Sequence, residues 1–276
     1  MYTAIFSRTY PMQEIAAVID AVAADGYQGM QANLSSAGLA SLPDTLPPGI
    51  ATRFGLEAKA KGIRVTALSG TYNMVHPDRA IRRGFRKGFE QVVTAAHQMR
   101  APIVTLCTGS RDPHNMWKFH PDNEGAAAWH DLVSELEFAL RSAEDAGIRL
   151  AIEPEPANVI CDARAAERLL KQMASPNLGI ILDAANLLTP ETLSQQHAVI
   201  EEAAGLLGGS LMLAHAKDID ASGRVVAPGE GAVDLAAFTS ALRAVGYDDA
   251  LVAHGFTPDK TRTAADFLHR LIGQFE

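Results

Sequence analysis

The chain has 276 residues, of which 47% are hydrophobic and 20% are charged, enough for one large core. Its 32 acidic and 24 basic side chains give a formal net charge of −8, and no lysine- or arginine-rich run is present. Because a nucleic-acid partner requires a basic face, this balance argues against one and is compatible with small neutral or metal-bound substrates.

Short apolar stretches alternate along the chain with longer segments of helical periodicity. The apolar stretches predict eight strands, at residues 3–7, 29–32, 63–68, 102–107, 149–152, 178–182, 211–214 and 250–253. Apolar residues spaced three and four apart predict eight helices, at residues 12–24, 49–61, 78–99, 124–146, 162–173, 193–207, 235–245 and 263–272. Two boundaries have clear local signals, because Gly147 ends the fourth helix and Asp234 is a typical N-cap for the seventh.

The strict alternation of strands and helices predicts right-handed crossovers and a parallel sheet. Eight such units most simply close into a (β/α)8 TIM barrel, an α/β fold that forms a single domain over residues 1–276. An open doubly wound sheet is the alternative, but no GxGxxG sequence opens the first helix. In a barrel the carboxyl ends of all strands meet on one face, so the residues that end different strands come together there.

Four consecutive strands end in residue types that bind metals. Glu153 ends the fifth strand, because Pro154 cannot extend a strand within a sheet. The next three strands end in the same way at Asp183, His215 and His254. A single carboxylate after a strand is often a helix N-cap or an ion-pair partner. The joint pattern, however, predicts one divalent metal ion held by these four side chains, and two imidazoles with two carboxylates suit manganese, iron, cobalt or zinc.

Several segments resemble one known family. IEPEPANV, GIILDAANLL, AHAKDID and PGEGAVDLAAFTSALRAVGYDDALVAHGF are similar to the xylose-isomerase-like sugar phosphate isomerase/epimerase superfamily, most clearly over residues 149–256. That family has a (β/α)8 barrel with a divalent ion among a glutamate, an aspartate, a histidine and a second glutamate on strands five to eight. The resemblance implies that Glu153, Asp183 and His215 hold such an ion, with manganese as the first choice and zinc, cobalt, iron or magnesium as alternatives.

Two positions depart from the family pattern. The strand-eight glutamate is His254 here, and the substrate-contacting histidine that follows the strand-six aspartate is replaced by Asn186. In the epimerase branch, two glutamates act as acid and base on opposite faces of the substrate carbon, so His254 breaks that pair. The departure argues against a plain two-glutamate 3-epimerase. It is compatible with a reaction that needs one base, such as aldose–ketose isomerisation or dehydration.

The loop of residues 108–123 is dense in polar and aromatic residues that suit a sugar-binding site. Arg111, Trp117 and His120 could grip a polyol, with the aromatic ring on a sugar face and the polar groups at its hydroxyls. Trp117 could instead only pack the loop. His76, after the third strand, stands at the same rim and is a further candidate for substrate binding.

Two charged residues beside the predicted ligands are candidates for the chemistry itself. Lys217 follows His215 by two residues and could stabilise an enediolate or a phosphate, or form a surface ion pair with Asp218. Glu155 follows Glu153 by two residues, on the same side of an extended chain. It could support the metal site, act as a spare base, bind substrate or form an ion pair within the loop.

These features predict a metal-dependent isomerase or epimerase of a small sugar, keto-sugar or polyol that works through a cis-enediolate. Glu153 would be both ligand and general base, and Lys217 or Arg111 would stabilise the developing charge. One alternative is a dehydratase or lyase, in which the same enolate expels a β-hydroxyl and a free acid such as His120 assists. Another is a sugar-binding barrel without chemistry. An apurinic-endonuclease type would need further zinc ligands and a basic DNA face.

The remaining features concern location and assembly. Cys107 and Cys161 do not indicate a disulfide framework, which fits a reducing cytoplasm, and Cys107 is expected in the core. Residues 1–12 lack a basic segment followed by an apolar one, so no signal peptide is expected. No run of about 18 apolar residues predicts a membrane span. The expected partner is a small carbohydrate, without nucleic acid or membrane, and a homodimer is compatible with a barrel of this size.

Overall fold

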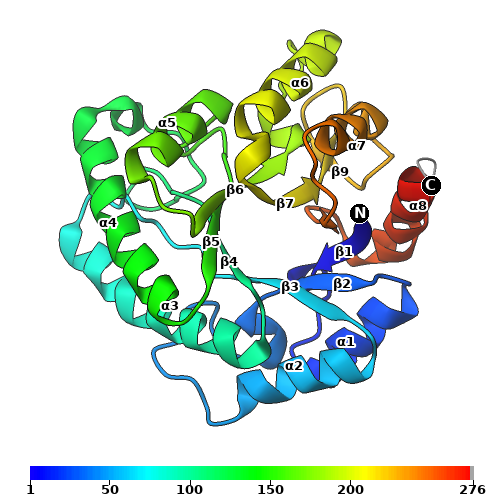
Figure 1. Ribbon diagram of the computed structural model, residues 1–276, viewed down its shortest axis with the longest axis horizontal. Coiled ribbons are helices and arrows are strands. Elements are labelled where there is room, and N and C mark those ends of the chain that lie inside the picture. The colour runs from blue at the N-terminus through cyan, green and yellow to red at the C-terminus, as the bar shows by residue number, and fades with distance from the viewer. Residues whose placement is uncertain (274–276) are drawn as a thin grey trace.

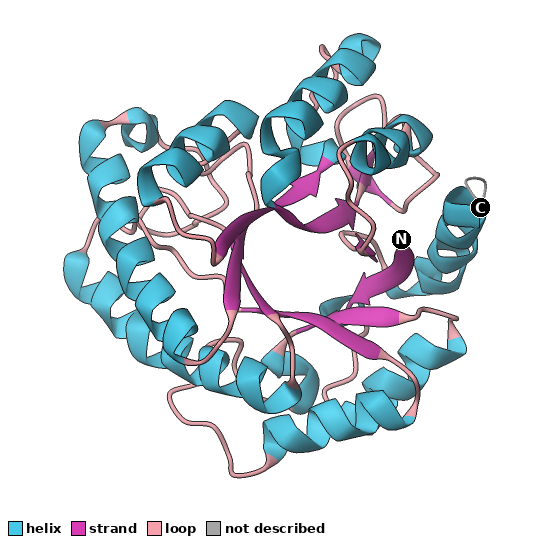
Figure 2. Cartoon of the chain, viewed as in Figure 1, coloured by secondary structure: helices cyan, strands magenta, loops and turns pink. Residues whose placement is uncertain are grey.

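Within residues 1–273, which the computed structural model describes, a closed barrel of eight strands is surrounded by eight α-helices. Figure 1 and Figure 2 show the ring of strands in the centre and the helices around it. The barrel strands are β1 (Tyr2–Phe6), β2 (Gly29–Ala32), β3 (Arg64–Ser69), β4 (Ile103–Leu106), β5 (Arg149–Ile152), β6 (Leu178–Asp183), β7 (Leu211–Ala216) and β10 (Ala250–Ala253). The helices are α1 (Ile15–Ala24), α2 (Ile50–Ala60), α3 (Arg79–Met99), α4 (Ala126–Asp145), α5 (Ala163–Met173), α6 (Gln196–Leu207), α7 (Leu235–Ala244) and α8 (Thr261–Gly273).

Every neighbouring pair of strands in the barrel is parallel, and β10 pairs with β1 to close the ring. The spatial order of the strands follows their order in the chain, as helical crossovers of constant handedness require. The (β/α)8 TIM barrel predicted from the alternation is therefore confirmed. The carboxyl ends of all eight strands meet on one face of the barrel, where the candidate functional residues lie.

The outer helices bury an apolar face against the barrel. In α1 the buried residues recur at helical spacing: Ile15, Val18, Ile19 and Val22. Asp234 caps α7 as predicted, because its Oδ1 accepts a hydrogen bond from the Ala237 backbone N–H at 2.9 Å. Among the helices of residues 1–273, none combines the length and the apolar character that crossing a membrane demands.

Three helices begin two or three residues later than the sequence predicts, and one of them is α1, which starts at Ile15 instead of residue 12. The helix predicted from residue 124 starts at Ala126, because Pro121–Glu124 form a 3₁₀ turn (η3) and Gly125 is the N-cap of α4. The helix predicted from residue 193 starts at Gln196, after a second 3₁₀ turn, η5 (Leu193–Gln195). Tighter turns often lead into α-helices, and hydrophobic spacing alone does not separate the two.

A short hairpin after β7 was missed from the sequence. β8 (Asp218–Ile219) pairs with β9 (Val225–Val226) in antiparallel fashion, whereas the sequence predicts no strand between residues 214 and 250. Strands of two residues are too short to leave a periodic pattern of apolar residues.

Asp218 is fully buried at the start of this hairpin and binds four backbone amides. Its Oδ1 accepts hydrogen bonds from the N–H groups of Ile219 at 2.9 Å and Val233 at 3.0 Å. Its Oδ2 accepts from Gly229 and Gly231, each at 3.0 Å. A Cβ atom on Gly231 would lie 2.1 Å from Oδ1, so this close approach requires glycine. One carboxylate thus fixes the path of the loop that leads into α7.

Replacing Asp218 with asparagine should lower the free energy of unfolding by about 2–4 kcal/mol. The amide nitrogen of asparagine cannot accept a hydrogen bond, so two of the four backbone N–H groups lose their acceptor. Urea denaturation of the purified variant measures the loss. Asp220→Asn is the matched control, because Asp220 lies in the same hairpin and is only partly buried. A loss no larger than that of the control would show that the four contacts do not stabilise the fold.

Candidate metal centre

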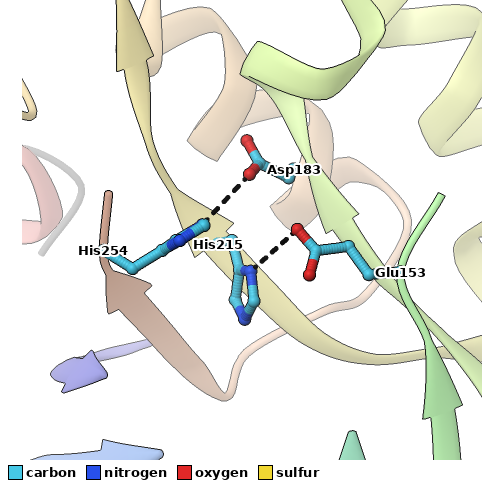
Figure 3. A group of neighbouring side chains, drawn as sticks. All are labelled: Glu153, Asp183, His215 and His254. Carbon is cyan, nitrogen blue, oxygen red and sulfur yellow. Dashed lines mark hydrogen bonds and ion pairs between the residues drawn. The ribbon is translucent and has the colours of Figure 1, made fainter. Parts of the chain in front are cut away.

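The four predicted metal ligands lie together at the carboxyl ends of neighbouring strands, as Figure 3 shows. Glu153 directly follows β5, Asp183 ends β6, His215 lies near the end of β7 and His254 directly follows β10. One ligand atom from each residue lies within 4.8 Å of the others. The barrel therefore joins four metal-binding side chains that are widely separated in the sequence.

The ligand atoms of these residues point toward one another. His215 Nδ1 lies 3.2 Å from Glu153 Oε1, and His254 Nε2 lies 3.1 Å from Asp183 Oδ2 (Figure 3). The centroids of the two imidazole rings are 4.4 Å apart. Glu153, Asp183 and His215 are buried, and His254 is partly exposed. Four donors in such a small, enclosed volume form a compact polar cluster at the carboxyl end of the barrel.

The protonation states of the cluster suit a divalent cation. Burial alone would raise the pKa of Glu153, but the His215 and His254 rings outweigh it and lower that pKa. Burial would also raise the pKa of Asp183, but Lys217 and His254 outweigh burial and hold that pKa well below its ordinary value. Burial and the neighbouring His215 ring lower the pKa of His254. Two ionised carboxylates beside a neutral imidazole are the ligand forms that a metal ion requires. The residues present therefore fit a divalent cation.

Gln31 on β2 orients His215 from across the barrel. Its Oε1 lies 2.8 Å from His215 Nε2, and its Nε2 donates to Thr105 Oγ1 at 3.2 Å. All three side chains are buried. With its amide nitrogen directed at Thr105, Gln31 accepts a hydrogen bond from the Nε2–H of His215. This tautomer leaves Nδ1, on the Glu153 side of the ring, with a lone pair for a metal ion.

Asn186 and Lys217 support the two carboxylates. Asn186 Nδ2 donates to Glu153 Oε1 at 3.0 Å, and Lys217 Nζ donates to Asn186 Oδ1. Lys217 Nζ also lies 3.2 Å from Asp183 Oδ2. Burial would lower the pKa of Lys217, but Asp183 and neighbouring carboxylates raise it overall, so the side chain stays charged. Its partner is therefore Asp183 rather than Asp218, and Asn186, predicted at a substrate-contacting position, holds Glu153 in place.

A cavity of about 360 Å³ opens beside the cluster. Five ionisable side chains of the predicted site line it: Glu153, Glu155, His215, Lys217 and His254. Hydroxyl groups line it too, from Ser41, Ser69, Thr71 and Thr105. Burial, opposed by the charge of Lys217, raises the pKa of Glu155 to about 7. The cavity thus offers hydrogen-bonding groups around a carboxyl that can exchange protons near neutral pH.

Trp117 stands at this cavity, whereas its neighbour Phe119 does not. Both side chains are 51% exposed, and both belong to the loop between β4 and α4. Only Trp117 is part of the cavity wall. Its indole ring is therefore placed where it could stack on a substrate, as predicted from the loop composition.

Besides Asn186, three other residues predicted to bind substrate lie outside the wall of this cavity. Arg111 is buried and forms an ion pair with Asp131 on α4, at 2.8 Å. His76 Nε2 lies 3.1 Å from the Pro113 carbonyl oxygen, which ties the loop after β3 to the loop after β4. His120 caps the 3₁₀ turn η3 with its Nδ1. These contacts hold the three side chains within the loops, and substrate binding by them stays a prediction.

The sequence did not reveal Gln31, Thr105 or the other hydroxyl groups of the cavity wall, and it assigned Cys107 only to the core. Gln31 and Thr105 are polar residues in short strands that are otherwise mainly apolar, and that contrast is a signal that could have revealed them. Cys107, expected in the core, is buried but also lines the cavity, with its Sγ 3.7 Å from Glu153 Oε2. Burial and the neighbouring Glu153 carboxylate raise the pKa of this thiol, so it stays protonated.

Comparison with protein families gives one match over most of the chain. Residues 19–271 match the family model described as xylose isomerase-like TIM barrel. No curated protein sequence matches the chain at a significant level.

Solved structures share this fold at low sequence identity. A D-tagatose 3-epimerase-like protein has a TM-score of 0.77 and 14% identity, over 99% of this chain and 97% of its own. The IOLI protein, crystallised with a binding zinc atom, has a TM-score of 0.74 and 16% identity, over 100% and 99% of the two chains. A fusion of a xylose isomerase-like TIM barrel with 4-hydroxyphenylpyruvate dioxygenase has a TM-score of 0.72 and 18% identity. This chain spans only 41% of the fusion protein, although 97% of its own length is matched.

Replacing Gln31 with leucine should weaken the binding of a divalent ion by about 10–100-fold, the usual effect of losing a partner that orients a metal-binding histidine. Leucine cannot accept the Nε2–H hydrogen bond of His215, so the ring loses its fixed orientation and tautomer. Calorimetric titration of chelator-treated protein with Mn²⁺ and with Zn²⁺ measures the change. Gln31→Glu is the matched control, because it keeps an oxygen acceptor and should retain affinity. Equal affinities for the wild type and the leucine variant would remove Gln31 from this role.

Proposed function

The chain belongs to the xylose isomerase-like TIM barrel family, and on that premise we propose that it is a divalent-metal-dependent isomerase of a small sugar, keto-sugar or related polyol. The observation that carries the proposal is the position of Glu153. This carboxylate belongs to the ligand cluster and also lines the adjoining cavity, whereas Asp183 is a ligand candidate outside the cavity wall. Glu153 is thus placed to meet both a metal ion and a substrate.

Glu153, Asp183, His215 and His254 would hold the ion. When bound there, a divalent cation polarises the carbonyl and hydroxyl oxygens of a substrate and makes the neighbouring C–H bond more acidic. Two imidazoles among the four ligands favour manganese, iron, cobalt or zinc over magnesium, which prefers oxygen ligands. The IOLI protein, a structural neighbour, was crystallised with zinc, which supports a divalent ion in this fold without identifying the one used here.

Glu153 would act as the general base. Its Oε1 accepts a hydrogen bond from Asn186 at 3.0 Å, and its Oε2, beside the Cys107 thiol at 3.7 Å, would take the proton from the substrate carbon. Transfer of that proton to the carboxylate leaves a cis-enediolate, and its return to the adjacent carbon completes the exchange of aldose and ketose. Lys217 remains charged beside the cavity and would stabilise the negative oxygens. Glu155 would move the proton between those oxygens.

Isomerisation is favoured over epimerisation because of His254. Inverting a carbon requires groups on both faces of the substrate, and the Nε2 of His254 is directed at Asp183 within the cluster. A metal-bound imidazole has no free lone pair with which to accept a proton. Epimerisation remains the second candidate, since Glu155 supplies another carboxyl on the cavity wall and a structural neighbour is named as a D-tagatose 3-epimerase-like protein.

Dehydration has weaker support in the structure. This reaction needs an acid near the β-oxygen of the substrate, and the sequence offers His120 for that role. His120 lies outside the cavity wall and caps a turn of the loop instead.

Replacing Glu153 with glutamine should lower kcat at least 100-fold, because an amide cannot accept the substrate proton. The assay is proton NMR in D₂O of the manganese-loaded protein with aldoses, ketoses and keto-sugars. An isomerase yields the partner sugar and exchanges one carbon-bound proton with solvent, whereas an epimerase yields the inverted sugar. Glu155→Gln is the comparison variant, and we expect it to keep measurable exchange. Retained turnover in Glu153→Gln would exclude Glu153 as the base.

Replacing Trp117 with alanine should raise KM by about 10-fold while changing kcat much less, because a stacking contact stabilises ground state and transition state alike. Phe119→Ala is the matched control, since Phe119 is equally exposed in the same loop but lies outside the cavity wall. Steady-state kinetics with the sugar identified by NMR compares the two variants. Equal changes in KM would show that Trp117 serves only to pack the loop.

A further inference from the structure

A second cavity lies at the opposite end of the barrel, where the strands begin. Its volume is about 450 Å³, and its lining includes the first residues of three alternate strands, Tyr2 of β1, Arg64 of β3 and Arg149 of β5. The catalytic sites of such barrels lie at the carboxyl ends of the strands. The cavity at the amino-terminal ends therefore needs an explanation separate from the metal centre.

The inner wall of this cavity is apolar. Ile103 and Leu213 line it, and both are buried members of the side-chain cluster that fills the barrel interior. Met99 and Met212 line it as well, and methionine side chains adapt readily to the shape of a ligand. A ligand that entered this cavity could remove apolar surface from water, which is favourable.

The rest of the lining carries an excess of positive charge. Four cations contribute to it, namely Lys59, Arg64, Arg100 and Arg149, against one carboxylate, Asp249, so the excess is three. Among residues 1–273, no carboxylate lies within 4.0 Å of any of these four cations. In a chain with a net charge of −8, four cations without such a partner around one cavity form a local anion-attracting surface.

Two of the arginines are positioned by the strands themselves. Arg149 lies two residues before Ala151 and four before Glu153, so alternation along β5 places it on the inward face of the barrel. The guanidinium carbon of Arg64 lies 4.5 Å from the centroid of the Tyr2 ring, a stacking contact that restrains the side chain. Because the strands and the Tyr2 contact already position these two arginines, anion binding would not incur the entropy cost of ordering them.

We propose that this cavity binds a small organic anion with an apolar body, such as a medium-chain carboxylate or an alkyl phosphate. The anionic head would lie at Arg149 and Arg64, and the apolar body would lie against Ile103 and Leu213. Arg149 and Glu153 are separated by about 13 Å along β5, at about 3.3 Å per residue. The ligand would therefore occupy a site distinct from the metal centre, and this inference does not depend on the proposed catalytic function.

Calorimetry and thermal unfolding of the full chain with octanoate, octyl phosphate and octanol test the proposal. Both anions should bind and raise the melting temperature, because a ligand specific for the folded state stabilises it. Octanol has the same apolar body without the charge and should bind at least 10-fold more weakly. The preference between the two anions identifies the head group. Binding of the anions should weaken as salt is added, since salt screens exposed charges.

Arg149→Met is the decisive variant, because methionine retains an apolar stem and removes the charge. It should lower octanoate affinity at least 10-fold, and Arg83→Met, which removes an exposed arginine of α3 outside the cavity wall, should not. Met212→Trp should block the cavity and abolish binding. If that variant does not fold, the Arg149→Met comparison decides alone. Absence of binding at millimolar octanoate, equal binding of octanol, or unchanged affinity in Arg149→Met would overturn the proposal. None of these results would bear on the metal centre.

Discussion

Two carboxylates buried side by side, Glu153 and Asp183, are the constraint on which the rest of the site depends. An ionised carboxylate that leaves water loses several kcal/mol of solvation unless charges or hydrogen-bond donors replace that water. Both carboxylates have such neighbours, because Asn186 donates to Glu153 while Lys217 and His254 lie beside Asp183. The polar residues at this end of the barrel can therefore be understood as one shell that stabilises two anions and orients them for a cation.

The fold and the four ligand candidates were predictable because they depend on local sequence and on one geometric rule. Pro154 marks the end of β5, and it identifies Glu153 as a strand-end residue without any knowledge of the partner strands. Alternation of strands and helices then predicts a barrel, and a barrel brings all such ends together. Asp183, His215 and His254 follow from the same reasoning, since no contact between the four had to be guessed.

The supporting contacts were not predictable, because they depend on which way each side chain points. Gln31 reaches His215 across the barrel interior, and the register and pleat of β2 decide whether it faces inward at all. Arg111 is the opposite case, in which the sequence suggests a contact with substrate and the structure shows a contact within the protein. Its loop has the composition of a sugar-binding segment, but its charge pairs with Asp131 on the neighbouring helix. Composition reports which groups are present, whereas the packing of α4 decides which of them remain available to a ligand.

His254 changes the electrostatics of the site as well as the choice of base. A glutamate at this position would place a third carboxylate beside Glu153 and Asp183, whereas a neutral imidazole leaves only two. Lys217 contributes a positive charge 3.2 Å from Asp183, so the three charges sum to −1 before any ion binds. A divalent ion would then leave the cluster with a charge of +1, which attracts an oxyanion more strongly than a neutral cluster would. The same replacement therefore removes a possible second carboxylate base and leaves a cluster charge that favours an anionic intermediate, which in the proposed isomerisation would be the enediolate.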